Sequence, residues 1–143
     1  MHIEIATAAT EELVTALSSL IPQLSSSAAP ITSDVVQSVL DDEAVTVFIA
    51  RHDEKIVGTL SLAIFHIPTG VRAWIEDVVV DDDARGLGVG LALTQAAIEY
   101  ASTHGARSVD LTSRASRTAA HRLYEKAGFH IRETNVYRYF FVS

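Results

Sequence analysis

The sequence predicts an α/β fold in which a mixed, mostly antiparallel sheet is flanked by about four helices. Two observations support this prediction. Three strand-like segments between residues 46 and 80 are joined by short polar turns, as in an antiparallel meander. The third of them leads through a glycine-rich loop and a helical segment to a further strand-like segment, and such a crossover joins parallel strands.

The N-terminal segment predicts one strand and two helices. Ile3 and Ile5 alternate with polar neighbours, which is typical of a strand. Thr10 is expected to be the N-cap of a first helix, and Ser33 to begin a second one. The prolines and small polar residues of 22–30 predict a loop between these helices, which is either a lid over a ligand site or a plain connection.

The meander itself comprises the expected strands Thr46–Ala50, Ile56–Phe65 and Trp74–Val80. Polar turns at 52–55 and 68–70 separate them. Gly58 interrupts the second strand, which indicates a bulge or a close approach of another element.

Length and composition predict one domain over residues 1–143, with an ordinary globular share of 48% hydrophobic residues. The chain has no cysteine, which excludes disulfides, thiolate metal sites and a cysteine nucleophile. The six histidines show no spacing that predicts a metal site, and Asp81–Asp83 is expected to be a solvated turn. We therefore expect no bound metal.

The net charge of −7 argues against a nucleic-acid partner, which would need a basic face. The same charge favours a cationic substrate such as an amine. The first residues lack the basic and apolar regions of a signal peptide, and no apolar run approaches the ~18 residues of a membrane span. The expected partners therefore include no membrane, and the expected location is the cytoplasm.

A glycine-rich loop, Arg85-Gly86-Leu87-Gly88-Val89-Gly90, connects the third strand of the meander to the next helix. Glycines free the backbone N–H groups to approach an anion, and the helix N-terminus attracts negative charge. The spacing fits neither the dinucleotide-binding fingerprint nor the P-loop, which also needs a lysine. The loop is either a phosphate cradle of another kind or a plain tight connection.

A second motif lies near the C-terminus, in the segment Ala119-Ala120-His121-Arg122-Leu123-Tyr124-Glu125-Lys126-Ala127-Gly128-Phe129. Apolar residues at helical spacing predict a helix from about Arg117 to Ala127, with Ser116 as its N-cap. Gly128 is expected to end this helix, and Phe129 to start a new strand.

These two segments together resemble the GNAT superfamily of N-acetyltransferases. The loop matches that family's pyrophosphate pattern, Gln/Arg-x-x-Gly-x-Gly/Ala, and the second motif matches Ala-x-x-Leu-Tyr-x-x-x-Gly-Phe. The resemblance covers roughly residues 45–141. It implies a sheet with two splayed parallel central strands, acetyl-coenzyme A as cosubstrate, and a primary amine of a small molecule or protein as acceptor. The alternative function is a non-catalytic acyl-coenzyme A binding or sensor module.

The resemblance also implies which residues bind the cofactor. They are the end of the third meander strand, the glycine loop and the start of the last helix, namely Val78, Val79, Val80, Arg85, Gly86, Leu87, Gly88, Val89, Gly90 and Arg117. Arg117 stands where family members often carry asparagine, seven residues before the tyrosine. We expect this arginine to meet a coenzyme A phosphate instead.

The chemistry of amine acetylation suggests the catalytic residues. An amine with a pKa of about 10.4 is protonated at neutral pH, so a base must remove its proton. Glu76 is the first candidate, directly or through water, and Asp77, which strand alternation points the other way, is the second. The position of Tyr124 in the family's motif implies that it is the acid that protonates the leaving thiolate. The alternative is that Tyr124 is a tyrosine of the hydrophobic core without a catalytic role. Val78 N–H is expected to stabilise the oxyanion. Without a cysteine, direct transfer in a ternary complex is favoured.

The last stretch, residues 136–141, is strongly aromatic. It is expected to form a closing strand of the sheet, and an edge that pairs two copies into a homodimer is the alternative.

Overall fold

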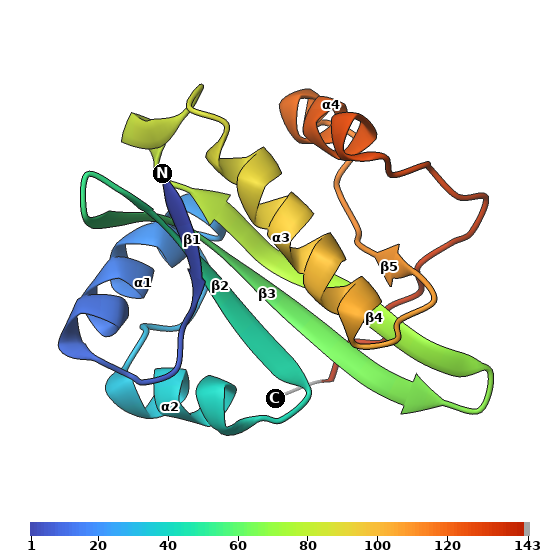
Figure 1. Ribbon diagram of the computed structural model, residues 1–143, viewed down its shortest axis with the longest axis horizontal. Coiled ribbons are helices and arrows are strands. Elements are labelled where there is room, and N and C mark those ends of the chain that lie inside the picture. The colour runs from blue at the N-terminus through green and yellow to red at the C-terminus, as the bar shows by residue number, and fades with distance from the viewer. Residues whose placement is uncertain (142–143) are drawn as a thin grey trace.

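The structure, a computed structural model, describes residues 1–141 (Figure 1). Its helices and strands, in chain order, are β1 (His2–Ile5), α1 (Glu11–Leu24), α2 (Ser33–Asp41), β2 (Val45–His52), β3 (Lys55–Ile67), β4 (Gly70–Val80), the short 3₁₀ helix η1 (Asp82–Ala84), α3 (Val89–Thr103), β5 (Val109–Asp110) and α4 (Thr118–Ala127). The strands form one sheet in the order β1-β2-β3-β4-β5. All neighbours are antiparallel except β4 and β5, which are parallel.

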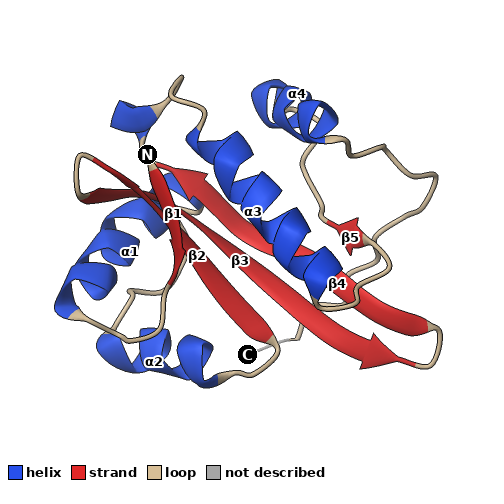
Figure 2. Cartoon of the chain, viewed as in Figure 1, coloured by secondary structure: helices blue, strands red, loops and turns tan. Residues whose placement is uncertain are grey.

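The helices cover both faces of the sheet (Figure 2). Helix α3 crosses one face, and α1 and α2 lie against the other. Each face therefore has its own hydrophobic core, one built around α3 and one around Leu13 of α1 and Val36 of α2. This three-layer arrangement, with a mostly antiparallel sheet and four α-helices, confirms the predicted fold class.

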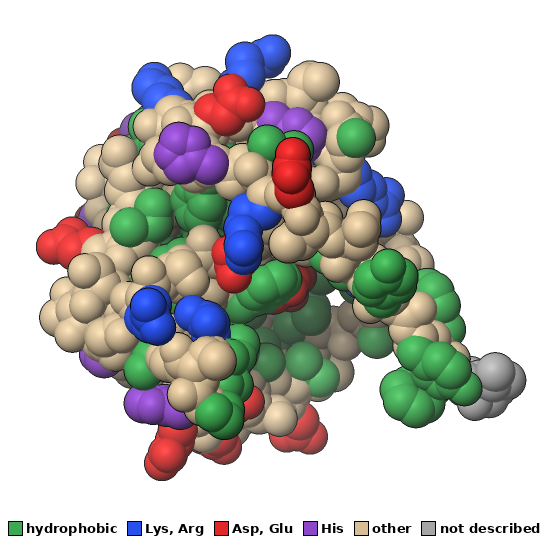
Figure 3. Space-filling view, turned by 90° about the vertical axis from the view of Figure 1, so that its right-hand side faces the viewer, with side chains coloured by type: hydrophobic (Ala, Val, Ile, Leu, Met, Phe, Trp, Pro, Cys, Tyr) green, Lys and Arg blue, Asp and Glu red, His purple; other side chains and the backbone are tan. Residues whose placement is uncertain are grey.

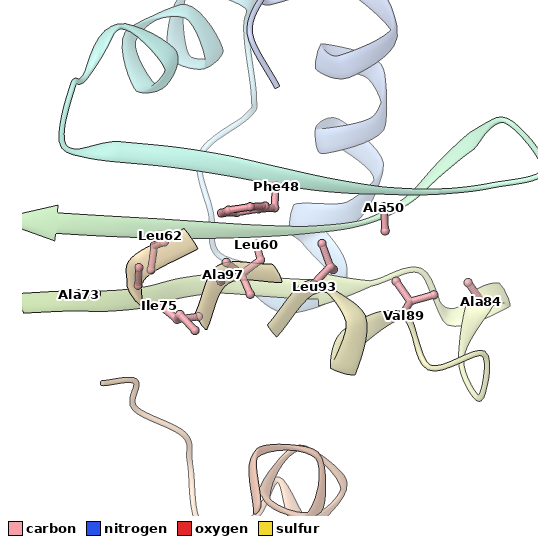
Figure 4. Packing of buried hydrophobic residues seen from close by; sticks show 11 residues of the cluster. Phe48, Ala50, Leu60, Leu62, Ala73, Ile75, Ala84, Val89, Leu93 and Ala97 are labelled. Carbon is pink, nitrogen blue, oxygen red and sulfur yellow. The ribbon is translucent and has the colours of Figure 1, made fainter. Parts of the chain in front are cut away.

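The core under α3 is tightly packed (Figure 4). Leu60 and Leu62 of β3 and Leu93 of α3 are fully buried. Small residues bring helix and sheet together, because a Cβ added at Gly58 would lie 2.9 Å from the Val89 side chain. Gly58 also adjoins a register shift between β2 and β3, so both features expected at this glycine are present.

The two N-terminal helices begin where the sequence predicts. The Thr10 hydroxyl accepts a 3.1 Å hydrogen bond from Leu13 N–H, and α2 starts at Ser33. Pro22 was expected in the following loop, but it lies inside α1, two residues before that helix ends. One proline near the end of a helix removes one hydrogen bond from the ladder and does not stop the last turn from forming.

An ion-pair network ties α1 to the sheet. Arg51 of β2 donates to Glu4 of β1 and, at 2.8 Å, to Glu12 in the first turn of α1. These hydrogen bonds lower the pKa of Glu12 and raise that of Arg51. The network fixes the start of α1, whose other end reaches the candidate site.

The parallel pairing of β4 with β5 is short. It joins Ala73 to Val109 and Trp74 to Asp110, whereas the sequence predicted a longer strand from Ser108 to Thr112. Beyond Trp74 the β5-facing edge of β4 therefore has no ladder partner in β5. This is the separation of two parallel strands that the family resemblance implies.

The predicted closing strands are wrong. Neither the strand expected from Phe129 nor the one expected at 136–141 forms, and β5 is consequently an edge of the sheet. Residues 130–141 are all exposed, so they bury too little surface against their own domain to form a strand of it. None of the helices within residues 1–141 combines the length and apolar character that crossing a bilayer requires.

Candidate active site

A pocket of about 170 Å³ opens where β4 and β5 separate. Side chains and backbone from α1, β4, the segment after β5 and α4 line it, namely Leu24, Ile75, Glu76, Asp77, Val78, Leu111, Thr112, Arg117 and Tyr124. Five residues singled out from the sequence for catalysis or cofactor binding line this one pocket, namely Glu76, Asp77, Val78, Arg117 and Tyr124. Leu24 ends α1, so the loop that was considered as a lid starts beside this pocket.

A β-bulge shapes the β4 side of the pocket. The register between β3 and β4 shifts between Thr59 and Ser61, which leaves one extra residue in β4. Asp77 lies at this point with a φ of +51°, a left-handed conformation that non-glycine residues seldom adopt. Strained residues of this kind cluster at functional sites. The bulge breaks the regular alternation of β4, and Glu76 and Asp77 are both among the residues that line the pocket.

Glu76 is held by a neighbour that the sequence interpretation missed. The indole Nε1 of Trp74 donates a 2.8 Å hydrogen bond to Glu76 Oε1. The i, i+2 spacing, which places both side chains on one face of a strand, was the available signal. The indole can donate but not accept, so it orients the carboxylate and leaves its other oxygen available.

Tyr124 is the buried aromatic group of the pocket, with 9% of its surface exposed. Its ring packs edge-on against Phe129, 5.9 Å between centroids, and Gly128 ends α4 between them with a φ of +103°. The spacing of the tyrosine, glycine and phenylalanine in the motif therefore has a packing basis. Burial raises the pKa of the Tyr124 phenol, and the nearby Arg117 cation opposes this shift.

Arg117 lies at the start of α4. The helix begins at Thr118 with Arg117 as its N-cap, so the predicted N-cap at Ser116 was wrong by one residue. Arg117 makes no side-chain capping bond, and its side chain is exposed. The preceding turn is held instead by His121, whose Nε2 lies 2.8 Å from the Arg114 carbonyl oxygen.

The acidic turn before the glycine loop has local structural partners. The Asp81 carboxylate accepts from Asp83 N–H and caps η1, while Asp82 pairs with Arg85 at 2.9 Å. Gln23 of α1 accepts a 3.0 Å hydrogen bond from Asp82 N–H, which ties this turn to α1. The turn therefore positions Arg85 at the entrance to the glycine loop.

The glycine loop has the geometry of an anion cradle. Gly86 and Gly88 have φ values of +82° and +77°, and a Cβ added at either one would meet no neighbouring atom. Gly88 is the N-cap of α3, no side chain caps that helix, and its first turn contains no acidic residue. The N–H groups of the first turn of a helix have no intrahelical acceptors, so these donors are available to an anion.

Gly90, in contrast, serves helix packing. A Cβ at Gly90 would lie 2.6 Å from Leu123 Cδ1, so its absence lets α4 approach α3. The side chains of Val79 and Val89 are buried, which leaves only their backbone for ligand contacts. Leu87, 48% exposed, lies on the outside of the loop.

Comparison with known proteins agrees with this geometry. The family model described as the acetyltransferase (GNAT) family matches residues 12–129, which is most of the chain. The chain belongs to the GNAT acetyltransferase family. The match includes α1, the glycine loop and the Tyr124 motif, and thus every element that lines the pocket.

Individual relatives of this GNAT chain are distant. It is 29% identical over 94 residues to N-alpha-acetyltransferase 30 of Schizosaccharomyces pombe, covering 65% of this chain and 62% of that protein. A candidate acetyltransferase from Agrobacterium tumefaciens has a TM-score of 0.87 at 27% identity, covering 97% of this chain and 99% of that one. An aminoglycoside acetyltransferase from an uncultured soil metagenomic sample, in complex with sisomicin, has a TM-score of 0.85 at 21% identity over 99% and 96% of the two chains, which indicates a shared fold. The chain thus spans less than two thirds of the curated relative's length.

Proposed function

We propose that this GNAT protein is an acetyl-coenzyme A-dependent N-acetyltransferase that acts on a primary amine within one domain of residues 1–143. The observation that carries the proposal is the meeting of Tyr124 and Glu76 in the pocket between β4 and β5. A phenol that stays protonated and a carboxylate are the two proton-transfer groups that amide formation from a thioester and an ammonium group needs.

The residues of the cradle fit the proposed cosubstrate. The glycines and uncapped start of α3 offer backbone donors to a diphosphate, and Arg85 and Arg117 supply positive charge near it. A further polar group is the Ser113 hydroxyl, which follows the pocket residue Thr112 and is buried without a hydrogen-bond partner among residues 1–141. Acetyl-coenzyme A would contribute an acetyl group activated as a thioester and a thiolate leaving group.

The proposed roles follow from these positions. Glu76, oriented by Trp74, accepts the proton of the bound ammonium group, directly or through water, so that the amine nitrogen can attack the acetyl carbon. Val78 N–H donates to the carbonyl oxygen as negative charge develops there. Tyr124 donates its phenolic proton to sulfur as the carbon–sulfur bond breaks. With no cysteine in the chain, we favour direct transfer between the two substrates in a ternary complex.

The acceptor is proposed to be cationic. Two acidic residues, Glu76 and Asp77, are among those that line the pocket, and the chain as a whole carries a net charge of −7. Carboxylates at the mouth of a site attract an ammonium group and orient it. Small-molecule amines and protein amines both satisfy this requirement.

The alternative is a non-catalytic module that binds acyl-coenzyme A. Such a module would need the glycine cradle but neither a buried phenol nor an oriented carboxylate at the pocket. The hydrogen bond from Trp74 to Glu76 favours the enzyme, because a sensor has no use for an oriented base.

A thiol-release assay with acetyl-coenzyme A and a panel of amines tests the proposal. We expect turnover with at least one cationic amine, and a loss of turnover of about 10²-fold or more in Tyr124→Phe. The affinity of Tyr124→Phe for acetyl-coenzyme A, measured by calorimetry, should be almost unchanged. Tight cofactor binding without turnover on any amine would support the binding module, and no cofactor binding at all would contradict both proposals.

A further inference from the structure

Three side chains of β4, namely Arg72, Trp74 and Glu76, form a row on the sheet that belongs to neither hydrophobic core. The residues between them, Ala73 and Ile75, are buried in the core under α3. Because side chains alternate along a strand, the row lies on the opposite face, the one on which α1 and α2 pack. The core under those two helices contains no residue of β4, so the row stays at the surface, with Glu76 exposed and Trp74 half-buried.

Asp110 of β5 brings a second carboxylate to this face. In the parallel ladder Asp110 is the partner of Trp74, whereas Val109, the partner of Ala73, packs against the core under α3. Asp110 therefore shares the face of Trp74. Its side chain is half-buried, and it forms no ion pair within residues 1–141. A partly desolvated carboxylate is stabilised by a cation, so this position favours a positively charged ligand.

The carboxylates of Glu76 and Asp110 are spaced for one short molecule. Along β4, Glu76 is two residues from Trp74, about 6.7 Å, and Asp110 is one strand to the side, about 4.8 Å. The Cα atoms of Glu76 and Asp110 are thus on the order of 8 Å apart. Trp74 adjoins both, because its Nε1 donates to Glu76 and its backbone pairs with Asp110. An indole covers methylene groups and attracts cations to its face.

We propose that the acceptor of the acetyl group is a straight-chain diamine, with one ammonium group at Glu76 and the other at Asp110. This inference rests on the proposed function and names the substrate class of the same site. A diamine with four or five methylenes holds its nitrogens roughly 6–8 Å apart when extended, because each bond of about 1.5 Å adds about 1.25 Å along a zigzag chain. This length matches the spacing of the two carboxylates, and Trp74 lies alongside the methylenes.

Only one of the two nitrogens reacts. The ammonium group at Glu76 gives up a proton to that carboxylate, directly or through water, and its nitrogen bonds to the acetyl carbon. The carbon–sulfur bond breaks, and the departing sulfur takes the phenolic proton of Tyr124. The second nitrogen stays protonated at Asp110. The amide product has lost the charge that Glu76 attracted, so it binds more weakly than the diamine and leaves.

Arg72 limits the site at its far end. It is the next member of the row beyond Trp74, and its Nη2 donates a 3.0 Å hydrogen bond to Thr69 Oγ1 in the turn between β3 and β4. A guanidinium is always charged, so it disfavours a third ammonium group beyond Asp110. Figure 3 views the side of the molecule that carries α4 and this turn, and shows acidic, basic and hydrophobic side chains interspersed there. This side therefore presents no continuous basic surface that would repel a diamine.

The fluorescence of Trp74 measures binding at this site directly, because it is the only tryptophan of the chain. Diamines of increasing length, and monoamines of matched length, are titrated against the protein with coenzyme A, which has no acetyl group to transfer. We expect the lowest Kd with four or five methylenes. That Kd should be about tenfold below the value for the matched monoamine, because the diamine adds a second charge-assisted interaction. A triamine should bind more weakly than the diamine.

Substitutions at Asp110 test the second contact. Asp110→Asn keeps the shape of the side chain and removes its charge, so the roughly tenfold preference for the diamine over the monoamine should disappear. Asp110→Lys should reverse the selection, so that an ω-amino acid of the same length binds better than the diamine. The matched control is Asp34→Asn in the first turn of α2, which removes the same charge elsewhere and should keep the preference. With acetyl-coenzyme A, the kcat/KM values of wild type should follow the same order.

The outcomes separate this proposal from the proposed function. Turnover of amines without a preference for diamines would overturn the diamine and leave the acetyltransferase in place. A preference that survives Asp110→Asn would overturn the proposal as well, and so would a Trp74 emission that no amine changes. Diamine binding without turnover of any amine would contradict the proposed enzyme, and with it the role of the diamine as acceptor.

Discussion

Leu123 of α4 occupies the space that a side chain at Gly90 of α3 would take. A Cβ at Gly90 would lie 2.6 Å from Leu123 Cδ1, closer than nonbonded carbon atoms approach. This contact joins the helix that begins at the anion cradle to the helix that carries Tyr124. The separation between the glycine loop and Tyr124 therefore depends on the absence of a side chain at Gly90.

We predict that Gly90→Ala lowers the free energy of unfolding by about 1 kcal/mol. Overpacking costs about 1–3 kcal/mol, and the better helix propensity of alanine returns about 0.5–1 kcal/mol. The Leu123 methyl is the end of a rotatable side chain, so part of the clash can relax. Equilibrium unfolding in urea measures the change.

A double-mutant cycle tests whether the contact with Leu123 causes the loss of stability in Gly90→Ala. Leu123→Ala alone removes a half-buried side chain and should cost about 2 kcal/mol. The two changes together should cost less than their sum by about 0.5–1 kcal/mol, because the alanine at 90 then has room. Additive effects would show that Gly90 does not limit the approach of α4.

The second prediction concerns the pair formed by Arg85 and Asp82. If Arg85 binds a cofactor phosphate, the Asp82 carboxylate competes with that phosphate for the Arg85 guanidinium. An exposed ion pair of this kind contributes about 0–1 kcal/mol. Asp82→Asn should therefore tighten binding of acetyl-coenzyme A by up to about fivefold, and Arg85→Gln should weaken it. Calorimetry at low and high salt measures both effects, which should shrink with salt.

Asp83→Asn is the control for this prediction. It removes the same charge from the neighbouring residue, which forms no ion pair within the described chain. Equal tightening by Asp82→Asn and Asp83→Asn would mean that only the general field matters. Unchanged binding in Arg85→Gln would remove Arg85 from the site.

The parts of the site that follow local sequence rules could be predicted. A glycine-rich turn before an amphipathic helix predicts free N–H groups, and Gly88 does form the uncapped start of α3. The second motif predicted the positions of Tyr124 and Gly128. Its spacing matches one face of helix α4 and the left-handed glycine that ends this helix. Both features depend on neighbours within a few residues, which is why the sequence determines them.

Two other features depend on contacts that sequence spacing does not show. The bulge at Asp77 arises from the pairing between β3 and β4, and the alternation of residues along one strand does not reveal it. The aromatic C-terminal segment has the composition of a strand, but composition does not say which sheet edge it joins.

The third prediction concerns the stability of the fold at acidic pH. Hydrogen bonding by Arg51 lowers the pKa of Glu12 below its ordinary value of 4.5. A carboxylate with a lowered folded-state pKa stabilises the fold above its unfolded-state pKa, and this contribution is lost as pH falls through the folded-state value. Glu12→Gln should therefore lower the melting temperature at neutral pH, and the difference from wild type should vanish in acid.

Glu11→Gln, which lies beside Glu12 in the first turn of α1, provides the control. Its effect should be smaller, because Glu11 forms no ion pair within the described residues. A melting-temperature difference for Glu12→Gln that persists unchanged at low pH would show that the Arg51 network does not act through charge.

The last prediction concerns Tyr124 at alkaline pH. Burial raises the pKa of its phenol, so the folded protein keeps the proton at pH values where the unfolded chain has lost it. The stabilisation is complete below the unfolded-state pKa of about 10 and is lost as pH rises toward the folded-state value, with a slope of at most about 1.4 kcal/mol per pH unit. The free energy of unfolding should thus fall more steeply above pH 10 in wild type than in Tyr124→Phe.

Two further variants separate this effect from general alkaline unfolding. Tyr137→Phe removes a hydroxyl from a side chain that is 91% exposed, and its pH profile should follow that of wild type. Arg117→Gln removes the cation that opposes the shift, so the steep region should extend to higher pH. Identical profiles for wild type and Tyr124→Phe would mean that the phenol ionises as easily in the folded protein as in the unfolded chain. A phenol of that kind would not be held protonated by burial, and the physical basis for Tyr124 as the acid would be lost.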